Sequence, residues 1–177
     1  SVPSPSRAVN GRPVIYISLG TVLNKQEGFY RSCMEALKEE DADVIMAVGM
    51  HTDISSLGSI PANFRIEPRV DQLRTLQQAR VFITHCGMNS VSESLYFGVP
   101  LVLFPQQPEE GAVARRTQEL GAGILLKNIY PAAVKDAVRQ ILEKEDYRDC
   151  ARRIGDTLRK AGGAAKAADG IEAVLRR

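Results

Sequence analysis

Short runs of Val, Ile and Leu alternate with longer amphipathic segments along most of this chain. A continuous apolar run is typical of a strand buried on both faces, whereas apolar residues roughly three to four positions apart indicate a helix. The pattern predicts strands at 14–20, 43–49, 64–68, 80–85, 101–105 and 123–126, and helices at 27–38, 71–79, 90–97, 112–120, 131–144, 147–161 and 163–177. Strands and helices that alternate in this way form parallel sheets. We therefore expect an α/β fold, a Rossmann-like parallel sheet with helices on both faces.

The chain length fits one domain that follows a short linker. Its 177 residues suffice to bury a substantial core. Residues 1–12 are rich in Pro and Ser and have neither the basic flank nor the apolar centre of a signal peptide. We expect 1–12 to be a linker and 13–177 to be one domain.

Charge and cysteine content exclude several classes of function. The 23 basic and 21 acidic residues are mixed along the chain, so no basic stripe is present to follow a nucleic acid. No apolar run is long enough to cross a bilayer. Cys33, Cys86 and Cys150 form neither a CxxC pair nor a Cys/His ligand array. We expect a cytoplasmic protein with no metal site, no membrane span and no nucleic-acid partner.

One predicted strand stops abruptly at His85 and gives way to a helix. In open α/β sheets, ligands bind beyond the carboxyl ends of the strands, where the amides of the next helix point outward. Gly87 would let the backbone turn closely, while Asn89 and Ser90 would either cap the helix or bind an anion. Glu93, one turn later, can accept two hydrogen bonds from a ribose diol. Together these side chains suit a phosphate and a sugar.

Each candidate also has an interpretation that needs no ligand. A histidine at a strand end is commonly a hydrogen-bonded structural residue, and Asn or Ser before a helix is commonly a cap. Glu93 can simply complement the helix dipole. The loop at 105–111 brings Glu109 and Glu110 to the same edge, where they could meet sugar hydroxyls or merely be solvated. On spacing alone, the interpretations without a ligand are favoured.

A long stretch of sequence favours the ligand-binding interpretation instead. Residues 70–123, which include VFITHCGMNSVSESLYFGVPLVLFPQQPEE, resemble the donor-binding signature of the UDP-glycosyltransferases. The stretch looks most like the bacterial macrolide and flavonoid branch, where HGGMNS or HAGMGS is typical, while plant members carry HCGWNS. The resemblance implies the C-terminal half of a GT-B glycosyltransferase. Residues 13–177 would then be the nucleotide-sugar binding domain, with 163–177 a helix that packs on an N-terminal domain missing from this chain.

The resemblance also implies a role for each candidate residue. His85 matches the histidine that meets the donor diphosphate, and Asn89 and Ser90 match residues that hold the phosphates. Glu93 matches the carboxylate that binds the ribose hydroxyls, and Gln72 matches the glutamine beside the uracil. The implied nucleotide-sugar site consists of Thr21, Arg69, Val70, Gln72, His85, Gly87, Asn89, Ser90, Glu93, Glu109 and Glu110.

Two positions depart from the family pattern. Arg69 stands where an aromatic residue commonly stacks on the uracil, although a planar guanidinium can also stack. Glu109 matches the acid at the sugar hydroxyls, but the following residue is Glu110 where glutamine is usual. A second acceptor therefore replaces an amide donor. These departures leave the choice between uridine and thymidine and the identity of the sugar open.

The resemblance implies an inverting transfer of a sugar from a UDP-sugar or TDP-sugar to a hydroxyl of a small lipophilic acceptor. His85, the amides after Gly87 and the helix dipole would stabilise the leaving diphosphate, with no cofactor or metal. The catalytic base and the acceptor site would belong to the missing domain, whether the chain is an excised half or a natural half with a partner chain. We therefore expect nucleotide binding without turnover from this chain alone, and self-association through an apolar patch that includes Tyr96.

Three alternatives remain open at this point. The first is an enzyme similar to the nucleotide-sugar epimerases, and the second is a nucleotide-sugar binding module without catalysis. The third is a Rossmann-like domain without any ligand, which the number of matched positions disfavours.

Overall fold

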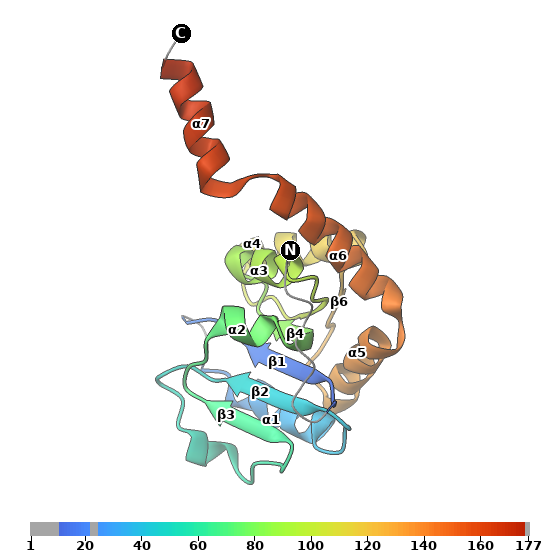
Figure 1. Cartoon of the computed structure of the whole chain (residues 1–177). Helices are drawn as coiled ribbons and strands as arrows, with labels where there is room; N and C mark the ends of the chain where they lie inside the picture. The colour runs from blue at the N-terminus through green and yellow to red at the C-terminus, as the bar shows by residue number, and fades with distance from the viewer. Residues whose placement is uncertain (1–10, 22–24, 176–177) are drawn as a thin grey trace.

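A parallel sheet organises the chain, as Figure 1 shows for the computed structural model, which describes residues 11–21 and 25–175. Within these residues the sheet has six strands in the order β3-β2-β1-β4-β5-β6. Every neighbouring pair is parallel, which confirms the predicted α/β fold. The strands are β1 (Val14–Ser18), β2 (Asp43–Ala47), β3 (Phe64–Glu67), β4 (Ala79–Thr84), β5 (Leu101–Leu103) and β6 (Gly123–Leu125). The helices are α1 (Glu27–Leu37), α2 (Gln72–Leu76), α3 (Met88–Tyr96), α4 (Pro108–Glu119), α5 (Pro131–Glu143), α6 (Glu145–Lys160), α7 (Gly163–Leu175) and the 3-10 helix η1 (Ile54–Leu57).

Helices cover both faces of the sheet, and the alternation of side chains along β1 decides which helices they meet. Ile15 and Ile17 lie in a core that buried side chains of α1 and α5 complete. Tyr16 lies in a second core, whose other members include residues of β4, β5, α2, α3 and α6. Because both faces of the central strands are covered, their sequences read as unbroken apolar runs.

Two helices begin earlier than the apolar spacing predicts. The helix α3 begins at Met88 and not at Ser90, and α4 begins at Pro108 and not at Ala112. The first turn of α4 is polar, so it carries no periodic signal. It is stabilised instead by the fixed φ of Pro108 and by the side chain of Glu110, which accepts backbone N–H groups before the helix.

The starts of α6 and of η1 were also not foreseen. The helix α6 begins at Glu145, and its N-cap residue Lys144 makes no side-chain cap bond. The apolar spacing predicts this helix only from residue 147, whereas Asp146 already lies within its first turn. The 3-10 helix η1 follows Asp53, whose side chain accepts a hydrogen bond from the backbone N–H of Ser55. An isolated single turn of this kind is too short to leave a periodic pattern.

The structure describes the C-terminal end of the chain more fully than the N-terminal end. Residues 1–10 of the predicted linker at 1–12 lie outside the described residues. The helix α7 extends away from the rest of the molecule in Figure 1, with Ile171 and Val174 exposed on it. In the described part of the chain, no helix is long and apolar enough to span a membrane. The role predicted for 163–177, packing on another domain, stays a prediction.

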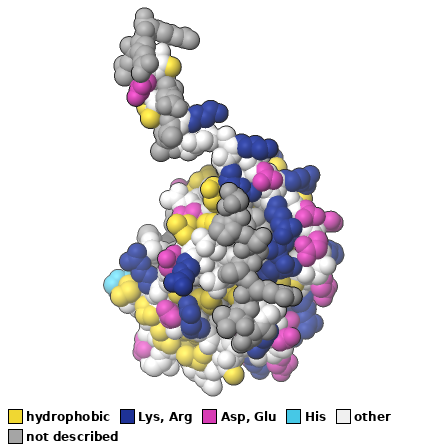
Figure 2. All heavy atoms as spheres, viewed as in Figure 1, with side chains coloured by type: hydrophobic (Ala, Val, Ile, Leu, Met, Phe, Trp, Pro, Cys, Tyr) yellow, Lys and Arg dark blue, Asp and Glu magenta, His cyan; other side chains and the backbone are white. Residues whose placement is uncertain are grey.

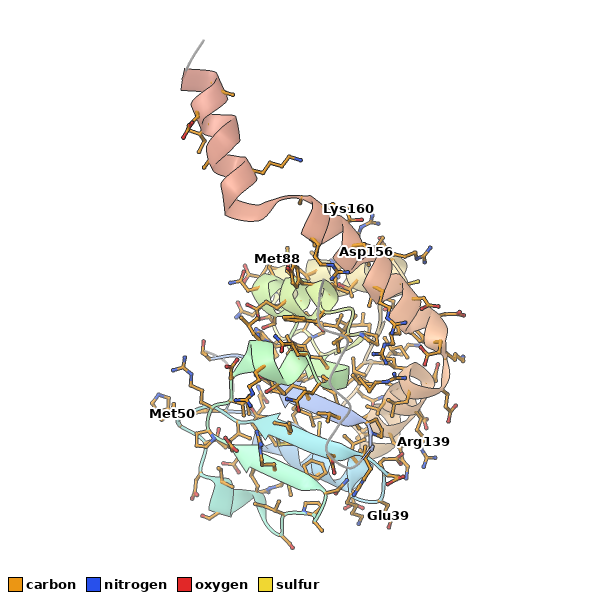
Figure 3. All side chains as sticks on the ribbon, in the orientation of Figure 1. Glu39, Met50, Met88, Arg139, Asp156 and Lys160 are labelled. Atoms are coloured by element: carbon orange, nitrogen blue, oxygen red, sulfur yellow. The ribbon has the colours of Figure 1, made fainter. Side chains whose placement is uncertain are left out.

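Figure 2 shows basic and acidic side chains intermixed on the face in view. One cluster joins the turn after α1 to α5, because Glu40 accepts from Arg139 at 2.9 Å and lies 3.5 Å from the Nζ of Lys135. Figure 3 places Arg139 at the opposite end of the sheet from Met50, which follows β2. This cluster therefore lies away from the edge where the strands end.

Candidate functional site

The strand order of the sheet reverses direction between β1 and β4. Beyond β1 the chain continues outward to β2 and β3, whereas beyond β4 it continues in the opposite direction to β5 and β6. The loops that follow β1 and β4 therefore diverge, and ligands of open α/β sheets bind where such loops separate. The loop after β1 carries Gly20 and Thr21, and the loop after β4 carries His85 and Gly87.

The imidazole of His85 is packed closely against two glycines, one from each of these loops. A Cβ atom at Gly20 would lie 2.7 Å from Cε1 of His85, and a Cβ atom at Gly87 would lie 2.6 Å from Nε2. Gly20 also has a φ of +76°, a conformation that residues with a side chain rarely adopt. The two loops thus need glycine for the same reason, which is to let the backbone approach the imidazole ring closely.

The surroundings of His85 favour its neutral form. Burial lowers the pKa of His85 from its ordinary value of 6.5, while the charge of Glu110 and the backbone carbonyl of Ser18 offset part of that shift. Nδ1 is buried and makes no hydrogen bond of normal geometry within the described residues. Near pH 7 the ring is therefore neutral and can donate one hydrogen bond to a ligand.

The residue between His85 and Gly87 has an unusual conformation. Cys86 has a φ of +72° and a fully buried side chain, whose Sγ lies 3.5 Å from the carbonyl oxygen of Thr84. Burial raises the pKa of the Cys86 thiol to about 12, so it stays protonated and is a poor nucleophile. The turn from β4 into α3 thus places a left-handed residue between the histidine and the helix.

The helix α3 begins directly after this turn. Its N-cap residue is Gly87, which has no side chain to accept the first amides. Asn89 and Ser90 lie within the first turn, so the alternative that they cap the helix is wrong. Asn89 is exposed and Ser90 is half-buried. The first N–H groups of a helix have no intrahelical partner and attract anions, so this end of α3 suits a phosphate.

A hydrogen-bonded cluster joins three elements beside that helix end. The Nε2 atom of Gln72, the first residue of α2, donates to Oε2 of Glu93 at 2.7 Å and to Oγ of Ser90 at 3.3 Å. The hydroxyl of Tyr16 donates to Oε1 of Gln72 at 3.2 Å. The sequence predicts Gln72, Ser90 and Glu93 as site residues, and the structure brings them together. Tyr16 was missed, because a tyrosine inside an apolar strand reads as part of the core.

In the predicted sugar-binding loop after β5, at 105–111, Glu109 lies as expected but Glu110 does not. Glu109 is exposed in the first turn of α4, as a sugar contact would require. Glu110 is only 6% exposed, and its Oε2 accepts from the backbone N–H of Gln106 at 2.7 Å and of Gln107 at 3.0 Å. Instead of offering a second acceptor at the surface, Glu110 holds the loop after β5 in shape. The signal that could have revealed this is the N3 position of Glu110 in a capping box.

The remaining predicted residues lie around the same edge. Thr21 is exposed directly after Gly20, Arg69 is exposed in the loop after β3, and Val70 is half-buried against the core of Tyr16 and Phe82. Among the described residues, no group of three or more His, Cys, Asp or Glu side chains could hold a metal ion. The edge therefore gathers hydrogen-bond donors, amides and carboxylates, which suits a phosphorylated ligand that carries hydroxyl groups.

Comparison with known families bears on the same segments. A family model described as "Erythromycin biosynthesis protein CIII-like, C-terminal domain" matches residues 31–168. The chain belongs to this EryCIII-like C-terminal domain family. The matched region begins within α1 and ends within α7, so it contains β4, α3 and the candidate site residues from Arg69 to Glu110.

Similar proteins carry names of glycosyltransferases. The EryCIII-like domain is 46% identical over 180 residues to the NDP-glycosyltransferase YjiC of Bacillus licheniformis, a match that covers 97% of this chain and 44% of that protein. It is 32% identical over 171 residues to demethyllactenocin mycarosyltransferase of Streptomyces fradiae, covering 96% of this chain and 37% of that protein. The predicted resemblance to the bacterial glycosyltransferases is confirmed. This chain spans less than half the length of these relatives.

A solved structure shares the fold. The crystal structure of CalG4, the calicheamicin glycosyltransferase, aligns with a TM-score of 0.84 at 33% identity, covering 94% of this chain and 43% of that one. The match confirms that the EryCIII-like domain has the Rossmann-like fold of the C-terminal half of a GT-B glycosyltransferase.

Proposed function

We propose that this chain is the donor-binding half of an inverting glycosyltransferase that uses a UDP-sugar or TDP-sugar. The observation that carries the proposal is the imidazole of His85, enclosed by Gly20 and Gly87 beside the uncapped start of α3. The names of the relatives support sugar transfer as the activity of the complete protein. In that protein the sugar would pass to a hydroxyl of a small lipophilic acceptor.

The proposed chemistry assigns the leaving group to this half. As the bond between the sugar and the diphosphate breaks, negative charge grows on the diphosphate. The neutral ring of His85 would donate a hydrogen bond to it, and the first amides of α3 and the helix dipole would stabilise the same charge. Thr21 lies in the loop after β1, and Asn89 and Ser90 lie in the first turn of α3. These three residues would hold the phosphates. The packed ring of His85 and the first amides of α3 are held by the fold itself, so they would need little reorganisation during the reaction.

The other candidate residues would fix the rest of the donor. Glu93 would accept hydrogen bonds from the ribose diol, with Gln72 beside it and Arg69 and Val70 next to the base. Glu109, exposed at the start of α4, would meet hydroxyls of the sugar. Glu110 would act indirectly, because its carboxylate orients the loop that precedes Glu109.

Binding of a nucleoside diphosphate is the first test of this proposal. We expect UDP or TDP to bind the purified chain in a calorimetric titration. In His85→Ala the affinity should fall by about tenfold to a hundredfold, the usual cost of a hydrogen bond to a charged group. The matched control is His51→Ala, because His51 is exposed in the loop after β2 and is not a predicted site residue. It should bind as the wild type does.

The pH dependence of the same titration separates a direct role of His85 from a structural one. A bound diphosphate favours the charged imidazole, so the pKa of His85 should rise from its lowered value and binding should take up protons. The ratio of the wild-type affinity for the nucleotide to that of His85→Ala should therefore increase as the pH falls from about 8 to about 6. The titration of the nucleotide itself is common to both proteins and cancels. A folded wild type that binds neither nucleotide would contradict the proposed function.

Turnover is expected to need more than this chain. The relatives are more than twice as long as the matched region, and we propose that the acceptor site and the catalytic base belong to the part that this chain does not contain. Incubation with UDP-glucose or TDP-glucose and small phenolic acceptors should give no glycoside above the level of a heat-denatured sample, measured by chromatography. Substantial product from this chain alone would show that it holds its own base and acceptor site.

A further inference from the structure

The side-chain hydroxyl of Tyr16 lies close to Gln72 and to Glu93, the residue proposed to bind the ribose. The residue is 1% exposed in the centre of β1, and its ring stacks on that of Phe82 from β4 with centroids 4.6 Å apart. Such a ring has little freedom to move. Its hydroxyl meets Gln72, and Ser18 on the same face of β1 and Glu93 of α3 also lie near it. Burial raises the pKa of Tyr16 to about 12, so the hydroxyl stays protonated and remains a donor.

The hydroxyl of Tyr16 matches one particular orientation of the Gln72 amide. An amide has one acceptor end and one donor end, and here the acceptor Oε1 faces Tyr16 while the donor Nε2 faces Glu93. If the amide were reversed, its oxygen would face the carboxylate of Glu93 and the interaction would become repulsive. Tyr16 and Glu93 therefore select the same orientation from opposite ends of the side chain.

Glu93 gains a fixed position from this arrangement. Its Oε2 accepts from Gln72 at 2.7 Å, a short distance that is typical of a hydrogen bond to a charged group. A carboxylate has roughly four acceptor positions, so one such bond leaves capacity for the two hydroxyls of a ribose. The three side chains come from β1, α2 and α3, and together they connect the buried centre of the sheet to the edge.

We propose that Tyr16 is a positioning residue that holds Gln72, and through it Glu93, in the geometry that binds the ribose diol. The proposal rests on the proposed function, because it takes the ligand to be a nucleoside diphosphate. Tyr16 itself would not touch the ligand. Its effect should therefore appear only for nucleotides that carry the diol, and it should depend on the presence of Gln72.

The test compares Tyr16→Phe with the wild type for two ligands, UDP and 2′,3′-dideoxy-UDP. The substitution removes one oxygen and keeps the ring that stacks on Phe82. We expect the affinity for UDP to fall by about threefold to tenfold, the usual value of one buried hydrogen bond. The affinity for the dideoxy nucleotide should not change, so discrimination between the two ligands should shrink by the same factor. An equal loss for both ligands, or no loss for either, would overturn the proposal.

A second pair of variants keeps the test decisive if Tyr16→Phe is less stable than expected. Gln72→Ala should weaken UDP binding at least as much, and Tyr16→Phe combined with Gln72→Ala should lose no more than Gln72→Ala alone. If the losses of UDP affinity in the two single variants add up in the double variant, Tyr16 does not act through Gln72 and the proposal is wrong. Tyr30→Phe is the matched control, since Tyr30 is a buried tyrosine of α1 in the other core. If the folded wild type binds neither ligand, the proposed function fails and this inference with it, whereas unchanged discrimination in Tyr16→Phe overturns the inference alone.

Discussion

Replacing Gly87 by Ala is expected to weaken nucleotide binding by about a hundredfold or more, a loss at least as large as that of His85→Ala. Gly87 has a φ of −58° and a ψ of 136°, which any residue can adopt, so the added methyl causes no backbone strain. The methyl carbon would instead lie 2.6 Å from Nε2 of His85. The ring has little room to move away, because the backbone at Gly20 also lies close to it. The substitution therefore displaces the imidazole and also obstructs the approach of a phosphate to α3.

Titration calorimetry with UDP and TDP measures this effect, and the chain offers a matched control. Gly28 lies in the first turn of α1, and a Cβ atom there would have no heavy atom within 4 Å. Gly28→Ala should keep wild-type affinity and change the free energy of unfolding by no more than about 1 kcal/mol. Wild-type affinity in Gly87→Ala would mean that the position of His85 does not matter for the ligand, which would remove the central support of the proposed site.

Gly155→Ala is expected to lower the free energy of unfolding by about 1 to 3 kcal/mol, the range for an overpacked contact. Gly155 is buried in α6 where this helix crosses the end of α3. An added Cβ atom would overlap the carbonyl oxygen of Leu95 and lie 3.2 Å from that of Tyr96. Both are backbone atoms, so they cannot rotate away and the two helices must separate. Arg159, which donates to the Tyr96 carbonyl and lies over its ring, would lose that arrangement.

Urea unfolding followed by circular dichroism checks this prediction. Gly111→Ala is the matched control, because Gly111 is also inside a helix but its Cβ atom would lie 3.5 Å from the flexible end of Arg115. That variant should be as stable as the wild type or gain up to about 1 kcal/mol from the higher helix propensity of Ala. Equal stability of Gly155→Ala and Gly111→Ala would show that α6 does not depend on close contact with α3.

The parts of the site that the sequence reveals are those next to a change in periodicity. The apolar run of β4 stops at His85 and the helical spacing resumes near Ser90, so the turn between them is visible from local pattern alone. Tyr16 and Gln72 are different, because they are 56 positions apart and their hydrogen bond depends on the order of strands in the sheet. The burial of Glu110 was also not predicted from the sequence. It arises because the loop before α4 folds against the first turn of that helix, where the Glu110 carboxylate accepts the N–H groups of that loop. Pairs of this kind are set by tertiary structure.

The strand order determines how well the site resists local unfolding. His85 and Gly20 follow β4 and β1, the two strands at the centre of the sheet, while β3 and β6 form its edges. Edge strands exchange their amide protons through small local openings, whereas central strands open only when most of the domain unfolds. Fluctuations at either edge would leave the imidazole and its two glycines in place. The enclosure around His85 thus persists as long as the domain itself stays folded.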